Sequence, residues 1–477
     1  MALMSKRILA TFMFATVPTC FAMAEPGNEA TARQIEQQYE ALLGLPTGIV
    51  KVATATDGYQ LVIDAPQLLQ KFAVPGLVVE GLQSFAMQLK PTSNGDWQIE
   101  QSDSFDISGR YQQPPSLETL SLRYKVGSLT GSGLASHDFQ IPKLMQLDMR
   151  DVSTSVVSGA YRSEQTAERI TWDQSTDNVR DGLLDLKTDS TETKMKNAGQ
   201  PDAWTADKLT SSIRMQGVPY LALQDLLDAW MKQVQLGKST PDIAVALRPD
   251  LQQIMPIARG LQYTGAFEGF AASAQGMELK ARNVTYSVDA ANLAGDVDLG
   301  IGLSIDTLEV DDRLPAATAE LLPDTVTMDV DVDELNFQRP WEYFIKSFSP
   351  QQALNDNQTA LLMNYLLPKD QVKLDISESR VASSLYDVTA GGTVDFKIGA
   401  PRPAGQIKIT AHRIDPLIAH LQKNVKQVPE FGQYAFFALA AKGFAQTGPD
   451  GGLVWDIEMD ETGAVRINGR SFGGAPN

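Results

Sequence analysis

Apolar and polar residues alternate with a period of two through most of this chain, and turn-forming residues interrupt the alternation at short intervals. The segment Phe85–Leu89 shows the pattern, and a return segment from Trp97 follows the turn Ser93–Asp96. The central Asn-Gly pair of this turn favours a type I′ hairpin, because both of its positions take positive φ. Side chains alternate between the two faces of a strand, so the pattern predicts antiparallel sheets with one apolar and one polar face.

Further strands are predicted wherever the alternation recurs. They are expected at 50–52, 59–63, Leu120–Tyr124, Phe139–Met149, Ser153–Tyr161, Arg169–Trp172, Leu183–Lys187, Ser211–Met215, Tyr263–Phe267, Glu278–Val288, Asp296–Val310, Thr325–Val332, Gln406–Ala411 and 454–467, the last as a hairpin. The eight residues after Gly469 are expected to form a mobile tail.

Short amphipathic helices interrupt these strands, each marked by apolar residues at helical spacing. They are expected near 28–43 (capped by Asn28), at Tyr220–Val234, within 243–257 (broken by two prolines), from Pro340 to Phe348, and at Thr359–Leu366, Pro416–Leu421 and Phe431–Ala441. A strand leads directly into a helix three times, at residues 211–234, 325–348 and 406–421. The predicted fold class is α+β and predominantly antiparallel β, with long curved or meandering sheets and a few short amphipathic helices. A boundary near Arg259 separates an N-terminal β-rich region, 25–259, from a C-terminal one, 260–477.

The first 24 residues have the features of a signal peptide. Lys6 and Arg7 precede an apolar run from Ile8 to Val17, and Ala22-Met23-Ala24 fits a signal peptidase site. Cleavage after Ala24 predicts a periplasmic protein. The run is shorter than the roughly 20 residues that span a bilayer, and no later uncharged stretch approaches that length, so no transmembrane segment is expected after signal removal.

Cys20 raises the alternative of a lipoprotein. The preceding Val17-Pro18-Thr19 fits a lipidation signal poorly, so we favour cleavage after Ala24. The mature chain would then contain no cysteine. A chain of this length can bury enough apolar surface to fold without disulfides.

The charge balance excludes some partners. The chain carries 40 Lys and Arg against 58 Asp and Glu, a net charge of −18, and losing Lys6 and Arg7 changes this to −20. Such a charge argues against nucleic acid as a partner and against electrostatic adhesion to anionic lipid. Neither a P-loop nor a dinucleotide-binding fingerprint occurs, so we expect no nucleotide cofactor.

The candidate catalytic motifs fail in their sequence context. Gly469–Gly473 matches the G-x-S-x-G pattern, but only four residues follow it, too few for the helix and histidine that this hydrolase chemistry requires. Asp329, Asp331 and Asp333 resemble a calcium loop, yet Glu334 and Pro340 occupy positions that need Gly and Glu. A solvated strand face explains these aspartates better.

The three histidines are His137, His412 and His420. His412 and His420 lie on a predicted strand and the next helix, and one interpretation brings them together with Asp415 as a zinc site. We favour the alternative in which they are a surface strand residue and a helix-end residue. No catalytic, cofactor-binding or metal-binding residue is therefore assigned.

With its signal peptide, its alternating strands, helices such as Leu223–Trp230 and the ending Gly463–Gly469, the chain resembles exported bacterial domain-of-unknown-function proteins of the YdgA-like group and their alphaproteobacterial counterparts. It resembles more distantly the AsmA-like envelope proteins, whose long β-grooves are associated with lipid passage. The resemblance implies no catalytic residue set.

Two functions follow as hypotheses. The first is a non-enzymatic cell-envelope protein that binds lipid or a partner protein in an apolar β-groove. The second is an envelope hydrolase that uses paired carboxylates, whose members cannot be chosen from so many acidic residues.

Overall fold

A computed structural model describes residues 28–42, 45–71, 76–112, 119–137, 141–199, 203–274, 277–310, 314–347, 355–400 and 402–472. The predicted signal peptide, Cys20, Phe139 and Phe348 lie outside these residues. The chain folds into two compact units. The N-terminal unit comprises Met1–Ala203, Thr210–Ala258 and Ile345–Ala353, and the C-terminal unit comprises Trp204–Leu209, Arg259–Phe344 and Leu354–Asn477.

The N-terminal unit begins with helix α2, Glu29–Leu42, which starts where Asn28 caps it: the Asn28 Oδ1 accepts a hydrogen bond of 2.8 Å from the Ala30 N–H. Its apolar face, with Ile35 and Tyr39, packs on the hairpin of β1 (Val50–Ala55) and β2 (Gly58–Ile63). Burial raises the pKa of the Tyr39 hydroxyl. The predicted helix and hairpin are both confirmed.

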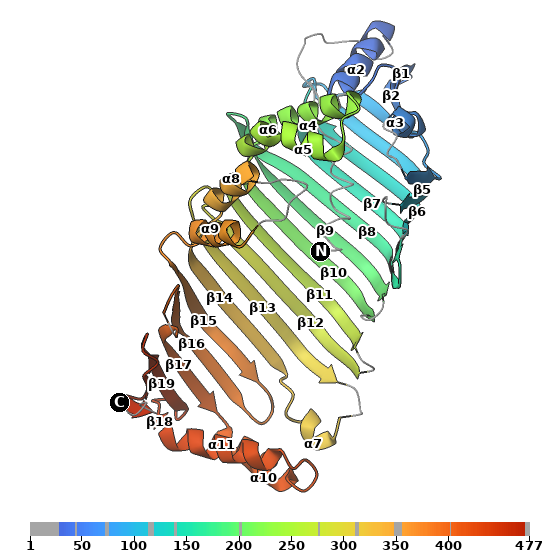
Figure 1. Ribbon diagram of the computed structural model, residues 1–477. Helices are drawn as coiled ribbons and strands as arrows, with labels where there is room; N and C mark the ends of the chain where they lie inside the picture. The colour runs from blue at the N-terminus through green and yellow to red at the C-terminus, as the bar shows by residue number, and fades with distance from the viewer. Residues whose placement is uncertain are drawn as a thin grey trace. The chain divides into compact units, whose positions relative to one another are not determined.

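Long antiparallel strands follow in sequence order, and from β4 to β10 each pairs with the next (Figure 1). They are β4 (Phe85–Pro91), β5 (Trp97–Gln112), β6 (Thr119–Ala135), β7 (Pro142–Ser158), β8 (Tyr161–Arg180), β9 (Leu183–Ala198) and β10 (Ala203–Val218). The short helix α3 (Ala65–Lys71) and strand β3 (Leu77–Glu80), which also pairs with β5, lie between β2 and β4 in the chain.

The structure corrects one strand prediction. The segments expected as separate strands at 139–149 and 153–161 belong to the single strand β7 from Pro142 to Ser158, whereas Ile141 precedes this strand and Tyr161 begins β8. Asp151 has a φ of 53°, and the register with β6 passes from Arg150 directly to Val152. Gly127 of β6 drops out of the pairing as well, so the register is kept, but the interruption reverses the alternation, and Met149 and Val152 are both buried in one cluster although they are three residues apart.

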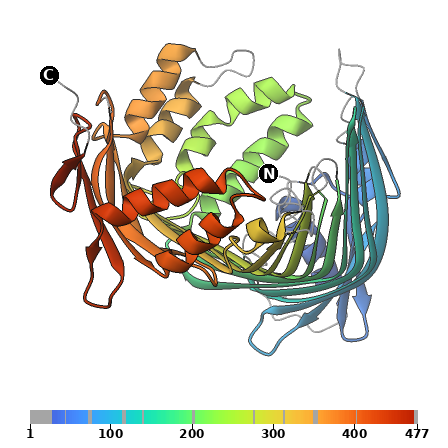
Figure 2. The same ribbon diagram turned by 90° about the horizontal axis from the view of Figure 1, so that it is seen from below.

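Three helices of this unit follow β10, namely α4 (Tyr220–Gln235), α5 (Thr240–Ala246) and α6 (Arg248–Gln253). They lie on the inner side of the unit's curved sheet (Figure 2). Gly237, with a φ of 66°, follows the end of α4, and its N–H donates to the Val234 carbonyl. The helix predicted at 220–234 is confirmed.

The C-terminal unit contains a second antiparallel meander in which β11 to β17 each pair with the next strand, and β17 then pairs with β19. The strands are β11 (Gly260–Ala274), β12 (Met277–Ala291), β13 (Asp296–Val310), β14 (Thr325–Asn336), β15 (Gln371–Ala382), β16 (Asp387–Lys397), β17 (Ala404–His412), β18 (Gln446–Thr447), β19 (Leu453–Met459), β20 (Val465–Ile467) and β21 (Arg470–Phe472). Antiparallel β-structure therefore dominates both units, as predicted.

The helices of this half of the chain are α7 (Ala316–Ala319), α8 (Gln338–Ser347), α9 (Asp356–Leu366), α10 (Ile414–Asn424) and α11 (Phe431–Phe444). All three predicted strand-to-helix successions are present, at β10–α4, β14–α8 and β17–α10. The expected tail is wrong in part, because Arg470–Phe472 forms β21 and pairs with β20. Among the described residues, no helix combines the length and apolar character needed to cross a membrane.

Candidate functional site

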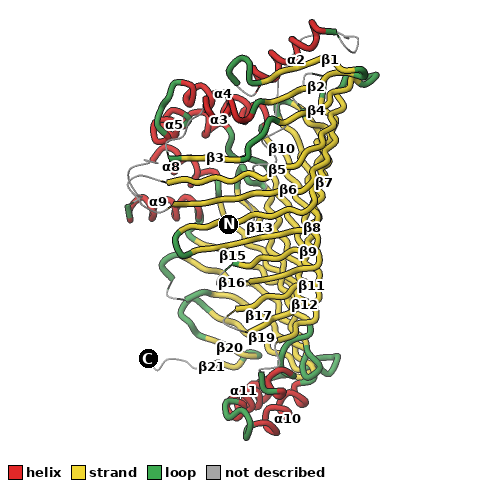
Figure 3. Tube along the Cα trace, turned by 90° about the vertical axis from the view of Figure 1, so that its right-hand side faces the viewer, coloured by secondary structure: helices red, strands yellow, loops and turns green. Residues whose placement is uncertain are grey.

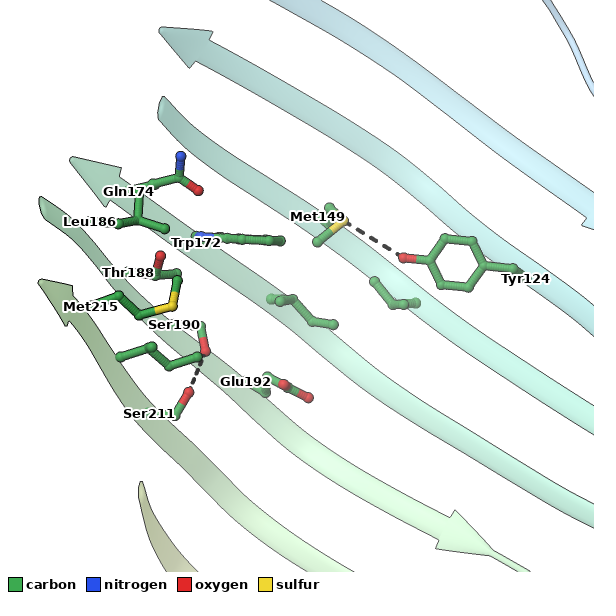
Figure 4. A pocket seen from close by; sticks show the side chains of 13 residues that line it. Tyr124, Met149, Trp172, Gln174, Leu186, Thr188, Ser190, Glu192, Ser211 and Met215 are labelled. Carbon is green, nitrogen blue, oxygen red and sulfur yellow. Dashed lines mark hydrogen bonds between the residues drawn. The ribbon is translucent and has the colours of Figure 1, made fainter. Parts of the chain in front are cut away.

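The candidate site is a pocket on the apolar face of the N-terminal sheet, where side chains from β6 to β10 converge (Figure 4). Every lining residue belongs to the N-terminal unit. The lining residues are Tyr124, Met149, Val152, Ile170, Trp172, Gln174, Leu186, Thr188, Ser190, Glu192, Ser211, Ile213 and Met215. The residues of β8, β9 and β10 recur at every second position, as expected for one face of a sheet.

The pocket is small and predominantly apolar. Its volume is about 160 Å³, whereas typical small-molecule pockets measure about 300–1,000 Å³. Met149 and Trp172 are 7% and 8% exposed, and Ile170 packs beside Met149. The pocket is suited to part of an elongated apolar molecule rather than to a whole metabolite.

The opposite face of the same strands is polar and held by ion pairs. Arg123 on β6 donates two hydrogen bonds to Asp106 on β5, at 2.8 and 2.6 Å. Arg169 on β8 binds Asp148 on β7 in the same way, at 2.9 and 2.8 Å, and this contact lowers the pKa of the Asp148 carboxyl. The predicted division into one polar and one apolar face is confirmed here.

Two buried polar atoms at the pocket have no hydrogen-bond partner among the described residues. They are Nε1 of Trp172 and Oε1 of Gln174, on side chains that are 8% and 5% exposed. Both residues lie on β8, two positions apart and therefore on the same face. A buried N–H or amide oxygen without a partner costs free energy, so both atoms are candidates to bind a polar group of a ligand; each exposes less than 1 Å² of surface, so neighbouring side chains have to move for that group to reach them.

Other polar groups of the pocket have partners. The Ser190 and Ser211 hydroxyls are 2.8 Å apart and share a hydrogen bond across β9 and β10. The Tyr124 hydroxyl lies 3.9 Å from the Met149 sulfur, and burial, followed by the charge of Glu192, raises its pKa. The tyrosine therefore stays neutral across the ordinary pH range.

The histidines do not form the zinc site that was considered. His412, at the end of β17, lies 3.4 Å from Asp450, and Asp415 pairs with Lys442 instead. His420 is buried within α10, where Nε2 is 2.8 Å from the Ala317 carbonyl and Nδ1 is 3.1 Å from Glu320. The expectation of a helix-end residue is thus wrong for His420, whose ring helps α10 pack against α7. No metal-binding group of His, Cys, Asp or Glu is found among the described residues.

The aspartates of β14 lie on a solvated strand face, as predicted. Asp331 and Asp333 line a shallow pocket of about 260 Å³ with Asp289, Asp298 and Asp375. Partial burial, and then the neighbouring carboxylates, raise the pKa of Asp331. The Ser471 of the G-x-S-x-G match lies on β21, paired with Arg466 of β20.

Sequence reasoning missed every residue of the apolar pocket as a site residue, although it placed Trp172 on a strand. The available signal was Gln174, a polar side chain at a position whose period places it on the apolar face. Comparisons with family models, with curated proteins and with solved structures found no match to this chain.

Proposed function

We propose that the protein is a non-enzymatic cell-envelope protein that binds a lipid in the apolar pocket of β6 to β10. The observation that carries this proposal is the combination of an apolar lining with the two buried, unpartnered polar atoms of Trp172 and Gln174. Binding sites for small molecules commonly join an apolar wall to a few placed polar groups. The ligand expected is an amphiphile with a hydroxyl or carboxyl group at the end of an alkyl chain.

The pocket volume sets the scale of the interaction. At roughly 30 Å³ per carbon-sized group, the share of one water in the liquid, the pocket holds about five methylenes. Burying each methylene contributes about 0.8 kcal/mol, so the apolar term is about 4 kcal/mol. That term alone corresponds to a Kd of about 1 mM. Hydrogen bonds to Trp172 and Gln174 therefore have to add to the affinity of any tightly bound ligand.

The first experiment identifies the ligand directly. The protein is produced from the full chain so that export can take place, purified without detergent, extracted with organic solvent and analysed by mass spectrometry. A lipid present in stoichiometric amount supports the proposal. A clean extract from folded protein, together with no saturable binding of a fluorescent fatty acid, contradicts it.

Two neighbouring positions of β8 give a matched pair of variants. Ile170 lines the pocket, whereas Thr171 points to the opposite face, beside Asp148 in the register with β7. Ile170→Lys places a charge among apolar groups, and we expect fatty-acid affinity to fall about 30-fold, as if half of the apolar term were lost. Thr171→Lys should bind as the wild type does. Equal binding by both variants would exclude this pocket as the site.

The hydrolase alternative draws on the acidic pocket of the C-terminal unit, because a raised carboxyl pKa such as that of Asp331 is a feature of general acids. Partial burial and then the neighbouring aspartates account for the raised pKa of Asp331 without any catalytic role. Hydrolysis of glycan or ester substrates that disappears in Asp331→Asn and persists in Ile170→Lys would favour this alternative.

A further inference from the structure

The two unpartnered polar atoms at the apolar pocket of β6 to β10 are one donor and one acceptor. Trp172 Nε1 can only donate a hydrogen bond, and Gln174 Oε1 can only accept one. Both side chains project from the same face of β8, and the nitrogen of the Trp172 ring lies at the end nearer to Gln174 (Figure 4). A ligand group that satisfies both atoms must therefore accept one hydrogen bond and donate another.

A neutral hydroxyl is the smallest group that does both, because its oxygen accepts while its hydrogen is donated. An ionised carboxylate only accepts, so it would leave the Gln174 oxygen without a partner. An ammonium group only donates, so it would leave the Trp172 N–H without one. Each of the two protein atoms exposes less than 1 Å², so a single oxygen also requires less movement of neighbouring side chains than a carboxylate does.

The charge at the pocket also favours a neutral ligand group. Glu192 of β9 is the one acidic residue of the lining, and no Lys, Arg or His is found among the described residues that line the pocket. Glu192 is partly buried and stands opposite Ile170 in the register with β8. Burial first, and then the charge of Glu192, raise the pKa of the Tyr124 hydroxyl of β6, so this charge acts across the pocket.

The basic residues beside the lining lie on the opposite face of the sheet. Arg169 of β8 and Lys187 of β9 are each one position away from a lining residue, so their side chains point to the other side. They pair there with Asp148 and Asp189, at 2.8 and 2.6 Å. Figure 3 shows β7, β8 and β9 side by side. A carboxylate that enters the pocket would thus be buried without a cation from its lining, which is costly.

We propose that the pocket selects amphiphiles that end in a neutral hydroxyl over those that end in a carboxylate, and that Glu192 enforces this selection. The inference rests on the proposed function, because it narrows the ligand class of the same pocket. The ligand hydroxyl accepts a hydrogen bond from Trp172 and donates one to Gln174. Trp172 pairs with Ser190 in the register, so Glu192 is its diagonal neighbour, about 7–8 Å away, and repels an anionic end. Fatty alcohols and monoacylglycerols belong to the favoured class, and free fatty acids to the disfavoured one.

An amphiphilic amine is the principal alternative ligand, because the carboxylate of Glu192 would attract its positive charge. The ammonium group cannot accept a hydrogen bond, however, so the buried N–H of Trp172 would stay unsatisfied. The hydroxyl is therefore the group that fits both the hydrogen-bonding atoms and the charge of the lining.

Competition binding with ligands of matched chain length tests the proposal. The protein is produced from the full chain, delipidated, and titrated with decanol, decanoate or decylamine against a fluorescent fatty acid, at about pH 8, where the carboxyl is ionised and the amine is protonated. The wild type should bind decanol about tenfold more tightly than decanoate, and more tightly than decylamine.

Glu192→Gln separates the effect of the charge from the general preference of an apolar pocket for neutral molecules. Decanoate should bind this variant about fivefold more tightly than the wild type, while the affinity for decanol changes by less than about twofold. Glu164→Gln is the matched control, because Glu164 is an exposed residue of β8 that does not line the pocket. The control should keep the wild-type ratio of the two affinities.

Gln174→Met tests the hydrogen-bond argument, because it removes the acceptor with little change in side-chain length. Decanol should bind about fivefold more weakly, since its hydroxyl loses a partner. Decanoate has no proton to donate to this position, so its affinity should not fall. Thermal unfolding of each variant checks that the fold is intact.

The outcomes distinguish this inference from the proposed function. Saturable binding of decanol and decanoate in a ratio that Glu192→Gln leaves unchanged would overturn the selection and leave lipid binding in place. Tighter binding of decanoate or decylamine than of decanol by the wild type would also overturn it. No binding of any of the three would overturn the proposed function as well. In the solvent extract of the native protein, a stoichiometric neutral, hydroxylated lipid supports the selection, and a stoichiometric free fatty acid contradicts it.

Discussion

Trp172→Phe should stabilise the lipid-free protein, although it makes a large buried side chain smaller. The indole N–H of Trp172 has no partner among the described residues, and an unsatisfied buried donor costs about 1–3 kcal/mol. Phenylalanine removes that donor and forfeits some apolar contact, worth about 1 kcal/mol in a site that already borders a pocket. The net gain expected is about 1 kcal/mol, or about 3 °C in the unfolding midpoint of the N-terminal unit.

Trp97→Phe is the matched control, because the Trp97 indole N–H donates a hydrogen bond of 3.1 Å to the His137 carbonyl. This variant loses both a satisfied hydrogen bond and apolar contact, so it should be less stable than the wild type by about 1–2 kcal/mol. Calorimetry of delipidated protein compares the two variants. If Trp172→Phe is destabilised as much as Trp97→Phe, the Trp172 N–H is already satisfied, and the argument for a polar ligand group beside it fails.

Three other variants test the packing and the electrostatics. Leu89→Ala, at a side chain that is 0% exposed, should lower the free energy of unfolding in urea by about 2–5 kcal/mol. Leu120→Ala, at a half-exposed side chain, should lower it by no more than about 0.5 kcal/mol. A hydrogen bond from Arg380 lowers the pKa of Asp387, so its stabilising effect is present above about pH 4 and disappears as the pH falls through the folded-state pKa. Asp387→Asn should therefore be about 1 kcal/mol less stable at about pH 7 and equal to the wild type once the pH is below the folded-state pKa of Asp387. Asp331 has a raised pKa, so its charge opposes folding. Asp331→Asn should therefore be about 0.5 kcal/mol more stable than the wild type at about pH 7 and lose that advantage below about pH 4. A loss of stability at neutral pH would contradict the raised pKa.

Much of the fold could be predicted from local sequence patterns. Asn28 and the Asn94-Gly95 turn act through contacts a few residues away, so the helix and the hairpin that they mark could be recognised from sequence. The continuous β7 could not, because the positive φ at Asp151 shifts the alternation and makes one strand resemble two.

The candidate site depends on contacts between strands that are distant in sequence. Alternation placed Trp172 on a strand, but its unpartnered N–H becomes evident only when the side chains of β6 to β10 are assembled. For α11, apolar residues on all sides are typical of a buried helix. In the structure Phe431 is buried and Phe436 is exposed, and the composition of the helix could not predict which of the two is buried.

The nearest-neighbour pairing of the meanders also has a consequence for how such a protein lengthens. Between β4 and β9 each strand after the first bonds to its predecessor and its successor, with only the short β3 as an additional partner of β5. Duplication of one hairpin would add two strands and extend the apolar face by about 10 Å, at 4.7–4.9 Å per strand, while leaving the other ladders intact. The length of the apolar face is thus an evolutionary variable, adjustable in hairpin steps.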